Sequence, residues 1–313
     1  MCDSYEHEEL SGEPRARFTI RPRGQFNLAV SVSFLEGFTS AAYEGAPPGH
    51  LHLAFPVDGS GDAAGVCVTQ NNEQVTIETF GDADPSLARD QAARILSLDV
   101  DGSGFVEVGR RDPVIGRIQQ QFSGFRPVLF NSPYEAAAWA LIGHRIRIVQ
   151  AAKLKSRIAE ESGSVVNIHG DRRRAFPRPS RLAESTEILG LPGRKAEYLQ
   201  ALALATRAGH LDVMRLRSLP WEEAMASLME LPGIGPFSAE LILLRGAGVV
   251  DRLPAHEQRF PRAVALAYDL PAAPNGDELE TITVPWRPFQ TWVAVLLRTM
   301  LERETGEIGR RKP

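Results

Sequence analysis

The segment from Leu231 to Ala239 constrains the fold more than any other part of the chain. It reads Leu-Pro-Gly-Ile-Gly-Pro-Phe-Ser-Ala and leads directly into a helix-compatible run. Two glycines around one aliphatic residue predict a tight hairpin between two helices, with backbone N–H groups near Gly233 and Gly235 facing outward. Because the helix dipole makes that end positive, the hairpin suits an anion such as a DNA phosphate. A hairpin used only for internal packing is the alternative.

Charge is distributed unevenly along the chain. The 313 residues suffice for two domains and carry a net charge of −4. Residues 1–118 contain 9 Lys/Arg against 18 Asp/Glu, whereas residues 119–313 contain 26 against 21. The basic surplus lies in the half that holds the hairpin, which favours an anionic partner there. An ordinary solvated surface would give the same count.

Several classes of protein are disfavoured by composition. The only cysteines, Cys2 and Cys67, predict no disulfide framework, zinc-ligand cluster or four-cysteine iron–sulfur motif. No apolar run is long enough to span a bilayer, and the polar N-terminus does not resemble a signal peptide. We therefore expect a cytoplasmic protein with no membrane partner. We also expect a monomer, because no long apolar stripe lacks a place in the predicted core.

The first half of the chain has the alternating pattern of antiparallel strands. A disordered tail is expected over 1–17, followed by an α+β antiparallel-sheet domain over 18–115. Asp84-Pro85 predicts the start of a helix that continues through Leu98. The predicted strands, separated by Gly, Pro, Asn and Asp turns, are Phe26–Phe34, Leu51–Phe55, Gly65–Thr69 and Gln74–Phe80.

The second half has a helical pattern throughout. Ser132-Pro133-Tyr134-Glu135 is a capping box that opens a helix through Ile146. The pattern predicts an all-α domain over 116–305 and a basic tail over 306–313. Further helices are expected near 149–162, 180–188, 194–208, 220–230, 237–246, 257–268 and 288–303.

An ordered set of motifs in this half resembles the helix-hairpin-helix superfamily of DNA glycosylases, closest to the bacterial 3-methyladenine DNA glycosylase II type. The similarity runs from about Leu96 to Arg298. Besides the hairpin, its motifs are Arg111-Asp112-Pro113-Val114, Ser132-Pro133-Tyr134-Glu135-Ala136, the ten residues 190–199, Leu244-Arg245-Gly246 and Trp286-Arg287-Pro288-Phe289.

The resemblance implies both a fold and an activity. It implies an α+β antiparallel-sheet domain followed by an all-α helix-hairpin-helix glycosylase domain. The implied enzyme is a monofunctional DNA glycosylase of base excision repair. It would flip a damaged nucleotide out of double-stranded DNA and hydrolyse the N-glycosidic bond of an alkylated purine of the 3-methyladenine type. No cofactor is required for that chemistry.

Glu257 occupies the position of the family's catalytic carboxylate. That Asp usually lies in a Phe-Pro-Ala-x-Asp context, and the matching segment here is Leu253-Pro254-Ala255-His256-Glu257. A carboxylate in a poorly hydrated site stabilises positive charge developing on the sugar. Glu extends roughly 1.5 Å further than Asp, and about 1 Å of misplacement can be costly. The alternative is a catalytically impaired helix-hairpin-helix DNA-binding protein; a protein-interaction module without DNA contact ranks third.

The resemblance also assigns a base pocket. Bifunctional relatives place a nucleophilic Lys at the position of Phe237, and Phe cannot form a Schiff base. Phe237 instead resembles an aromatic wall against which a flipped base stacks, with a core aromatic under the hairpin as the alternative. Trp286 is a weaker pocket candidate, for which core packing is favoured.

Further residues are implied to contact DNA or an ion. His144 and Arg145 match the position of a wedge that fills the gap left by a flipped nucleotide. Backbone carbonyls of Met229, Leu231 and Gly233 would hold a Na⁺ or K⁺ ion that bridges to a phosphate, with donors near Gly235. The basic run 172–174 is interpreted as a solvated loop.

Overall fold

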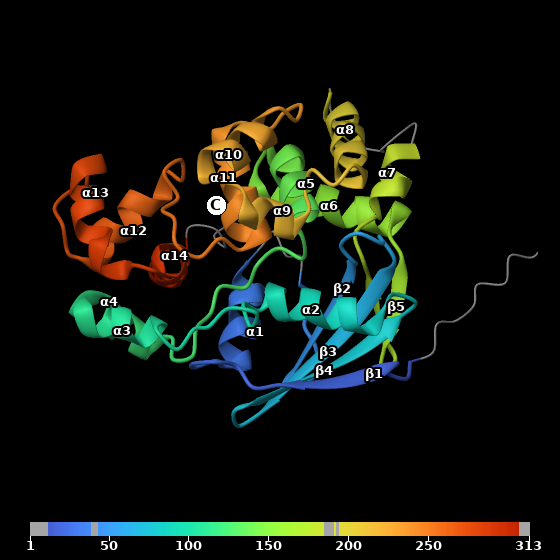
Figure 1. Ribbon diagram of the computed structural model, residues 1–313, viewed down its shortest axis with the longest axis horizontal. Coiled ribbons are helices and arrows are strands. Elements are labelled where there is room, and N and C mark those ends of the chain that lie inside the picture. Colours follow the sequence, from blue (N-terminus) through green and yellow to red (C-terminus); the bar gives the residue numbers. More distant parts are fainter. Residues whose placement is uncertain (1–11, 39–42, 185–190, 192–193, 307–313) are drawn as a thin grey trace, which may run out of the picture.

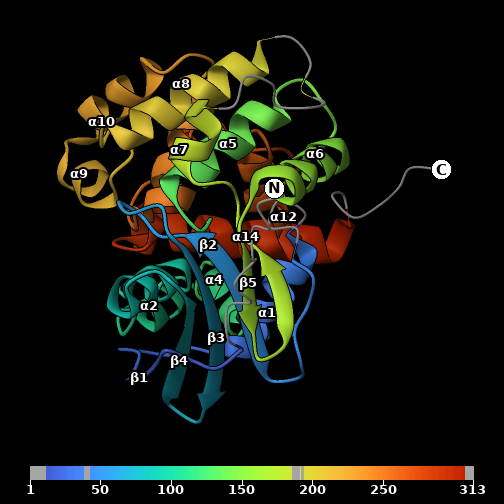
Figure 2. The ribbon, with the colours of Figure 1, turned by 90° about the vertical axis from the view of Figure 1, so that its right-hand side faces the viewer.

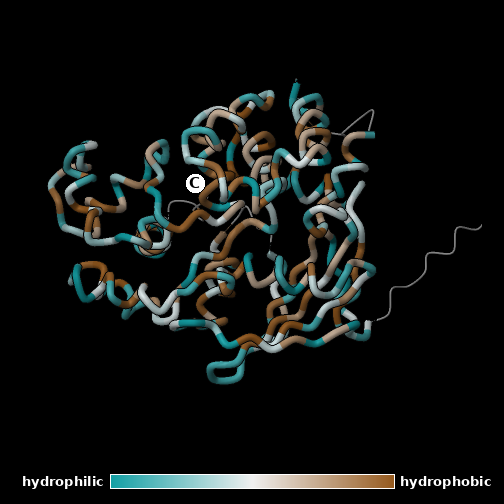
Figure 3. The backbone as a smooth tube through the Cα atoms, in the orientation of Figure 1, coloured by the Kyte–Doolittle hydropathy of each residue, from teal (hydrophilic) through white to brown (hydrophobic). Residues whose placement is uncertain are grey.

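A four-stranded antiparallel sheet forms one layer of the computed structural model, which describes residues 12–38, 43–184, 191 and 194–306 (Figure 1). Its order is β1-β4-β3-β2. The last three strands confirm the predicted ones, and their connecting β3–β4 turn is hydrophilic (Figure 3). The strands are β1 (Ala16–Ile20), β2 (His50–Pro56), β3 (Ala63–Asn71) and β4 (Gln74–Gly81). Strand β1 begins inside the predicted tail 1–17; residues 1–11 and 307–313 of the two predicted tails lie outside the described part.

The two faces of this sheet are covered differently. Helix α2 (Pro85–Ile95) packs across β3 and β4, and its alanines share a core with Val66 and Ile77. The other face is covered by a hairpin of β5 (Val165–Ile168) and β6 (Asp171–Arg174), which lies along the sheet (Figure 2). Gly65 permits this approach, since a Cβ there would come within 2.8 Å of the hairpin side chains. The prediction of a loop at 172–174 in an otherwise helical half was therefore wrong.

The segment Phe26–Phe34 is also different from its prediction. It forms helix α1 (Leu28–Gly37), in which Leu28, Ser31 and Leu35 are buried at helical spacing. The Asn27 side chain caps the helix by accepting the Ala29 N–H at 3.0 Å. Alternating valines and serines suggested a strand, but the three- and four-residue spacing of the buried positions decided the outcome.

A helical layer lies above the sheet and has its own apolar core. It confirms most of the predicted helices, although the end of helix 180–188 falls outside the described residues. No helix in the described part of the chain is long and apolar enough to cross a membrane. The elements are α5 (Pro133–Gly143), α6 (Ile148–Ser162), α7 (Pro179–Glu184), α8 (Lys195–Arg207), α9 (Val213–Ser218), α10 (Trp221–Met229), α11 (Pro236–Leu241) and the π-helix η2 (Ile242–Ala247).

A third cluster joins helices that are far apart in sequence. Two short helices, α3 (Phe105–Arg111) and α4 (Pro113–Gln121), share a core with the C-terminal helices, and Figure 1 shows them together at one end of the molecule. A boundary at 115/116 would cut through this core. The C-terminal elements are α12 (Arg259–Ala267), α13 (Gly276–Thr283), the 3₁₀ helix η3 (Val284–Trp286) and α14 (Gln290–Thr305).

Asp112 holds this third cluster together. Its Oδ1 caps α4 by accepting the Val114 N–H at 3.0 Å and the Ile115 N–H at 3.3 Å. Its Oδ2 accepts the Trp286 indole N–H at 3.1 Å and the Tyr268 hydroxyl. Trp286 is fully buried, so its candidacy as a base-pocket residue was wrong and the favoured core packing is confirmed. Its one polar atom is satisfied in the core, which an indole requires.

Replacing Asp112 with Ala is expected to lower the free energy of unfolding by roughly 3 kcal/mol. The change removes a helix cap and takes the carboxylate acceptor away from the buried Trp286 indole N–H and the half-buried Tyr268 hydroxyl. Asp84→Ala is the matched control, because Asp84 also precedes a Pro and only caps α2. Denaturant unfolding should show the larger loss for Asp112→Ala; equal losses would contradict the bridging role.

Candidate active site

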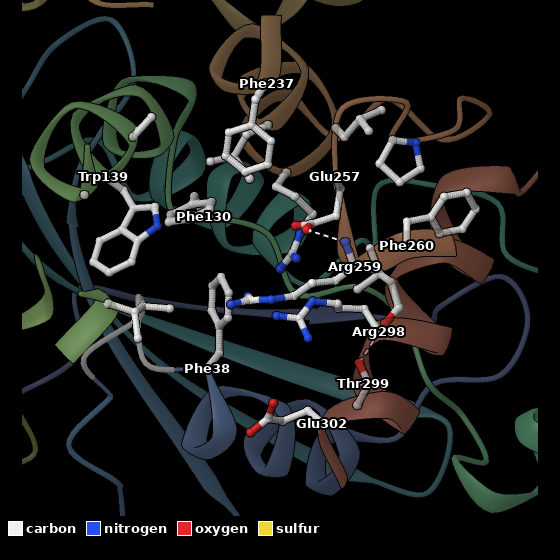
Figure 4. Close-up of a pocket in the computed structure, with 18 of the residues that line it drawn as sticks. Phe38, Phe130, Trp139, Phe237, Glu257, Arg259, Phe260, Arg298, Thr299 and Glu302 are labelled. Atoms are coloured by element: carbon white, nitrogen blue, oxygen red, sulfur yellow. Dashed lines mark hydrogen bonds between the residues drawn. The ribbon is translucent and has the colours of Figure 1, made fainter. Parts of the chain in front are cut away.

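A cleft of about 2090 Å³ opens between the hairpin, the α5–α6 turn and α14 (Figure 4). Its lining comes from α1 beside the sheet, from the helical layer and from the C-terminal helices of the third cluster. Six of the predicted site residues line it, namely His144, Arg145, Gly233, Gly235, Phe237 and Glu257. Trp286, Met229 and Leu231 do not.

The hairpin has the predicted geometry at one wall of the cleft. Gly233 adopts φ +83°, in the left-handed region that favours glycine. A Cβ at Gly233 would also lie 2.6 Å from the Tyr198 ring and 2.8 Å from Leu141. Gly235 is extended and caps α11. Only glycine therefore fits at position 233, and the turn delivers Phe237 to the cleft.

Monovalent cations prefer oxygen ligands, and the predicted ion site consists of the backbone carbonyl oxygens of Met229, Leu231 and Gly233. The type of ligand atom therefore suits Na⁺ or K⁺. The Leu231 carbonyl accepts the Ile234 N–H at 3.0 Å, which leaves one of its two lone pairs. Met229 ends α10, where carbonyls lack a partner within the helix. The Na⁺ or K⁺ site stays a prediction.

Glu257 lies in the connection between η2 and α12 and is half-buried. Its Oε1 accepts the Arg259 N–H at 3.1 Å, so the carboxylate is oriented by the first turn of the following helix. In Figure 4 it reaches into the cleft between Phe237 and Arg298. The candidate carboxylate therefore does not face open solvent on the far side of α12.

Glu240 is a site residue that the sequence analysis missed. It lies on α11, is only 3% exposed, and accepts the N–H groups of Ala255 and His256, both at 2.9 Å. His256 Nδ1 lies 3.4 Å from the same carboxylate. Glu240 thus ties the second hairpin helix to the segment that carries Glu257. A charged residue inside the apolar run 239–244 was the signal that could have revealed it.

Aromatic side chains form much of the cleft wall. Phe38, Phe130 and Trp139 lie on one side in Figure 4, and Phe237 projects from above. Phe237 is 45% exposed, so the alternative of a core aromatic under the hairpin was wrong. Phe38 directly follows α1, and Trp139 lies on α5. No local sequence motif connects either residue to the hairpin. The cleft can therefore stack a planar ring.

The cleft is also basic. Seven Lys or Arg residues line it against three Glu residues. Arg245 lies over the rings of Phe34 and Phe38, at 5.3 and 5.0 Å from their centres. Burial lowers the pKa of Arg245 to about 10, which keeps the guanidinium charged at neutral pH. This balance favours a ligand that carries phosphates.

The turn between α5 and α6 presents His144 and Arg145 at the cleft edge. Both side chains are exposed. Arg145 adopts φ +57°, a left-handed conformation that is uncommon for a residue other than glycine. Such residues concentrate at functional sites, where surrounding structure maintains them. The position is compatible with the predicted wedge.

Comparisons with known proteins agree with this geometry. The chain is 24% identical over 241 residues to DNA-3-methyladenine glycosylase of Bacillus subtilis (strain 168), covering 74% of this chain and 80% of that protein. It is 32% identical over 157 residues to DNA-3-methyladenine glycosylase 2 of Escherichia coli (strain K12), covering 47% of this chain and 54% of that one. A solved 3-methyladenine DNA-glycosylase from Archaeoglobus fulgidus superposes with a TM-score of 0.74 at 22% identity, over 93% of this chain and 99% of that one.

These relatives and the matching fold support placing the chain in the helix-hairpin-helix DNA glycosylase superfamily. A scan against family models finds no match. The cleft beside the hairpin is the candidate active site, because the exposed Phe237 and the oriented Glu257 both line it.

Glu240→Gln is expected to loosen the segment that carries Glu257. An amide keeps the shape but offers only one acceptor oxygen to the Ala255 and His256 N–H groups. Hydrogen–deuterium exchange of residues 253–258 should become about tenfold faster, corresponding to a lost charge-assisted hydrogen bond. Glu230→Gln, an exposed change at the end of α10, is the control. Unchanged exchange in Glu240→Gln would contradict the tie.

Proposed function

We propose that this protein is a monofunctional DNA glycosylase of base excision repair that removes alkylated purines from double-stranded DNA, with Glu257 as its catalytic carboxylate. The observation that carries the proposal is the placement of Glu257, held by the Arg259 N–H and facing the exposed Phe237 across the cleft. The names of the sequence relatives support the same class of activity.

The cleft suits the steps that precede bond cleavage. Outward N–H groups at the hairpin and the basic lining would grip the phosphates on either side of a damaged nucleotide. Arg145 would enter the duplex as the nucleotide leaves it, because a guanidinium can stack on bases. The extruded base would then lie against Phe237 and Trp139.

Glu257 would act on the sugar. As the C1′–N bond breaks, its electrons leave with the base and positive charge spreads over C1′ and the ring oxygen. The Glu257 carboxylate stabilises that charge and orients a water molecule, which adds to C1′ and loses a proton. Phe237 offers no amine at the position where bifunctional relatives carry Lys. The product is therefore an abasic site in an unbroken strand.

Two features of the cleft bear on which class of base it would take. An alkylated purine nucleotide is cationic, and aromatic faces such as those of Phe130 and Trp139 attract cations. The positive surplus favours a second candidate, a neutral base rich in carbonyl groups, because Arg245 and its basic neighbours would repel a cation. Deaminated and oxidised purines belong to that class.

Purified protein is expected to release 3-methyladenine or 7-methylguanine from methylated duplex DNA, and Glu257→Gln should slow release at least about a hundredfold. The substitution preserves shape and removes the charge, so DNA binding should persist. The matched control is Glu304→Gln, an exposed change on α14. Chromatography of the released bases makes the measurement.

The outcomes separate the hypotheses. Release that survives Glu257→Gln would remove Glu257 from the mechanism. Release from hypoxanthine or 8-oxoguanine duplexes alone would select the second base class. Salt-sensitive binding to duplex DNA with no release from any of these substrates would favour the impaired DNA-binding alternative.

Arg145→Ala is expected to slow base release from a fully paired duplex by about tenfold, because it removes support for the extruded state. The defect should shrink when the target lies opposite a gap, where no base pair has to open. Single-turnover rates on the two substrates give the comparison, with Arg172→Ala on the exposed edge of β6 as the control. An equal loss on both substrates would contradict a wedge.

A further inference from the structure

Side chains that can bind a transition metal lie on the sheet face that the β5–β6 hairpin covers, and none of them lines the cleft. The strand register places His52 of β2 opposite Cys67 of β3, and Cys67 opposite Glu78 of β4. His50 lies two residues before His52 and so shares its face. The β5–β6 hairpin covers this face and adds His169 from its turn.

The ligand atoms are close enough for one ion. A ring nitrogen of His50, a ring nitrogen of His52 and Cys67 Sγ all lie within 4.8 Å of one another. His50 Nδ1 is 3.2 Å from Cys67 Sγ. In a tetrahedral zinc site the sulfur and nitrogen ligands are separated by about 3.5 Å, as bond lengths near 2.3 and 2.0 Å require. Small side-chain rotations would therefore complete the geometry.

His52 supplies the independent sign of a ligand. It is only 2% exposed, and its Nδ1 pairs with Asp171 Oδ2 at 2.9 Å. Its Nε2 is buried with no hydrogen-bond partner among the described residues. A carboxylate on one nitrogen and a free second nitrogen is the arrangement that orients metal-binding histidines. Arg173 Nε in turn holds Asp171 at 2.8 Å.

We propose that His50, His52 and Cys67 bind one Zn²⁺ ion on the sheet face beneath the β5–β6 hairpin. Imidazole and thiolate ligands select zinc over calcium or magnesium. The fourth ligand is water, because Glu78 already pairs with Arg17 and, at 2.7 Å, with His169. Half-buried His50 leaves a path for the ion.

The cysteine count alone predicts no zinc-ligand cluster, and the spacing of positions 50, 52 and 67 matches no zinc motif. Strand register assembles the ligands instead. Zinc binds the thiolate, so the ion displaces the Cys67 thiol proton when it binds. The site joins β2 to β3, so it would stabilise the sheet and is independent of the proposed glycosylase activity.

The test uses the full chain carrying Cys2→Ser, which leaves Cys67 as the one thiol. The metal-free protein is titrated with Co²⁺, followed by absorption, and with Zn²⁺ against a chromophoric chelator. We expect one equivalent of each, a thiolate-to-cobalt charge-transfer band, and a Tm raised by about 5 °C at saturating Zn²⁺.

Two variants decide the assignment. Cys67→Ser should abolish the charge-transfer band and weaken zinc binding at least about a hundredfold. His50→Ala should weaken zinc binding by a similar factor. Because His50 is only half-buried, this variant provides the test if Cys67→Ser does not fold. His210→Ala, an exposed histidine elsewhere, is the control and should bind normally. No cobalt–thiolate band in the parent protein, or equal zinc affinity in parent and His50→Ala, would overturn the proposal.

Discussion

The two hydrogen bonds that Glu240 accepts from residues 255 and 256 fix where the candidate catalytic carboxylate can lie. A buried carboxylate is costly unless it accepts hydrogen bonds. If the segment that carries Glu257 moved away, the buried Glu240 carboxylate would lose these two donors. The same helix, α11, carries Phe237 one turn earlier. One short helix therefore sets both the aromatic wall and, through Glu240, the position of Glu257. Such preorganisation is what charge stabilisation in a transition state requires.

Other buried charges hold the layers that enclose the cleft. Arg94 on α2 donates to the Gly246 carbonyl at 2.9 Å and pairs with Asp58 at 2.7 Å, which joins the sheet layer to η2. Arg126 donates to the Ser97 carbonyl at 2.8 Å and lies over the Trp292 ring of α14. These contacts reach main-chain carbonyls across layer boundaries. Helix α1 beside the sheet, the helical layer and the third cluster of helices all contribute to the cleft, so its geometry depends on such contacts between the layers.

Local patterns predicted much of the fold and part of the site. The caps at Asp84 and Ser132, each followed by Pro, begin helices as expected, and the two residues that the family resemblance singled out, Phe237 and Glu257, line one cleft. These caps and motifs involve residues that are close together in the sequence, so they can be recognised without the structure. Residues such as Trp139 and Glu240 join the site through long-range packing, which no local pattern encodes. The strands of the β5–β6 hairpin were missed because each has only four residues, too few for a clear alternating pattern, and because their packing against the sheet is a long-range contact.

The central claim is that Glu257 stabilises positive charge on the sugar of an extruded nucleotide. It is tested most directly by binding of duplex DNA that carries either a cationic pyrrolidine or a neutral tetrahydrofuran in place of one nucleoside. Wild-type protein should bind the pyrrolidine duplex at least about tenfold more tightly, and Glu257→Gln should bind both alike. Equal wild-type affinities, or a preference that persists in Glu257→Gln, would contradict the account.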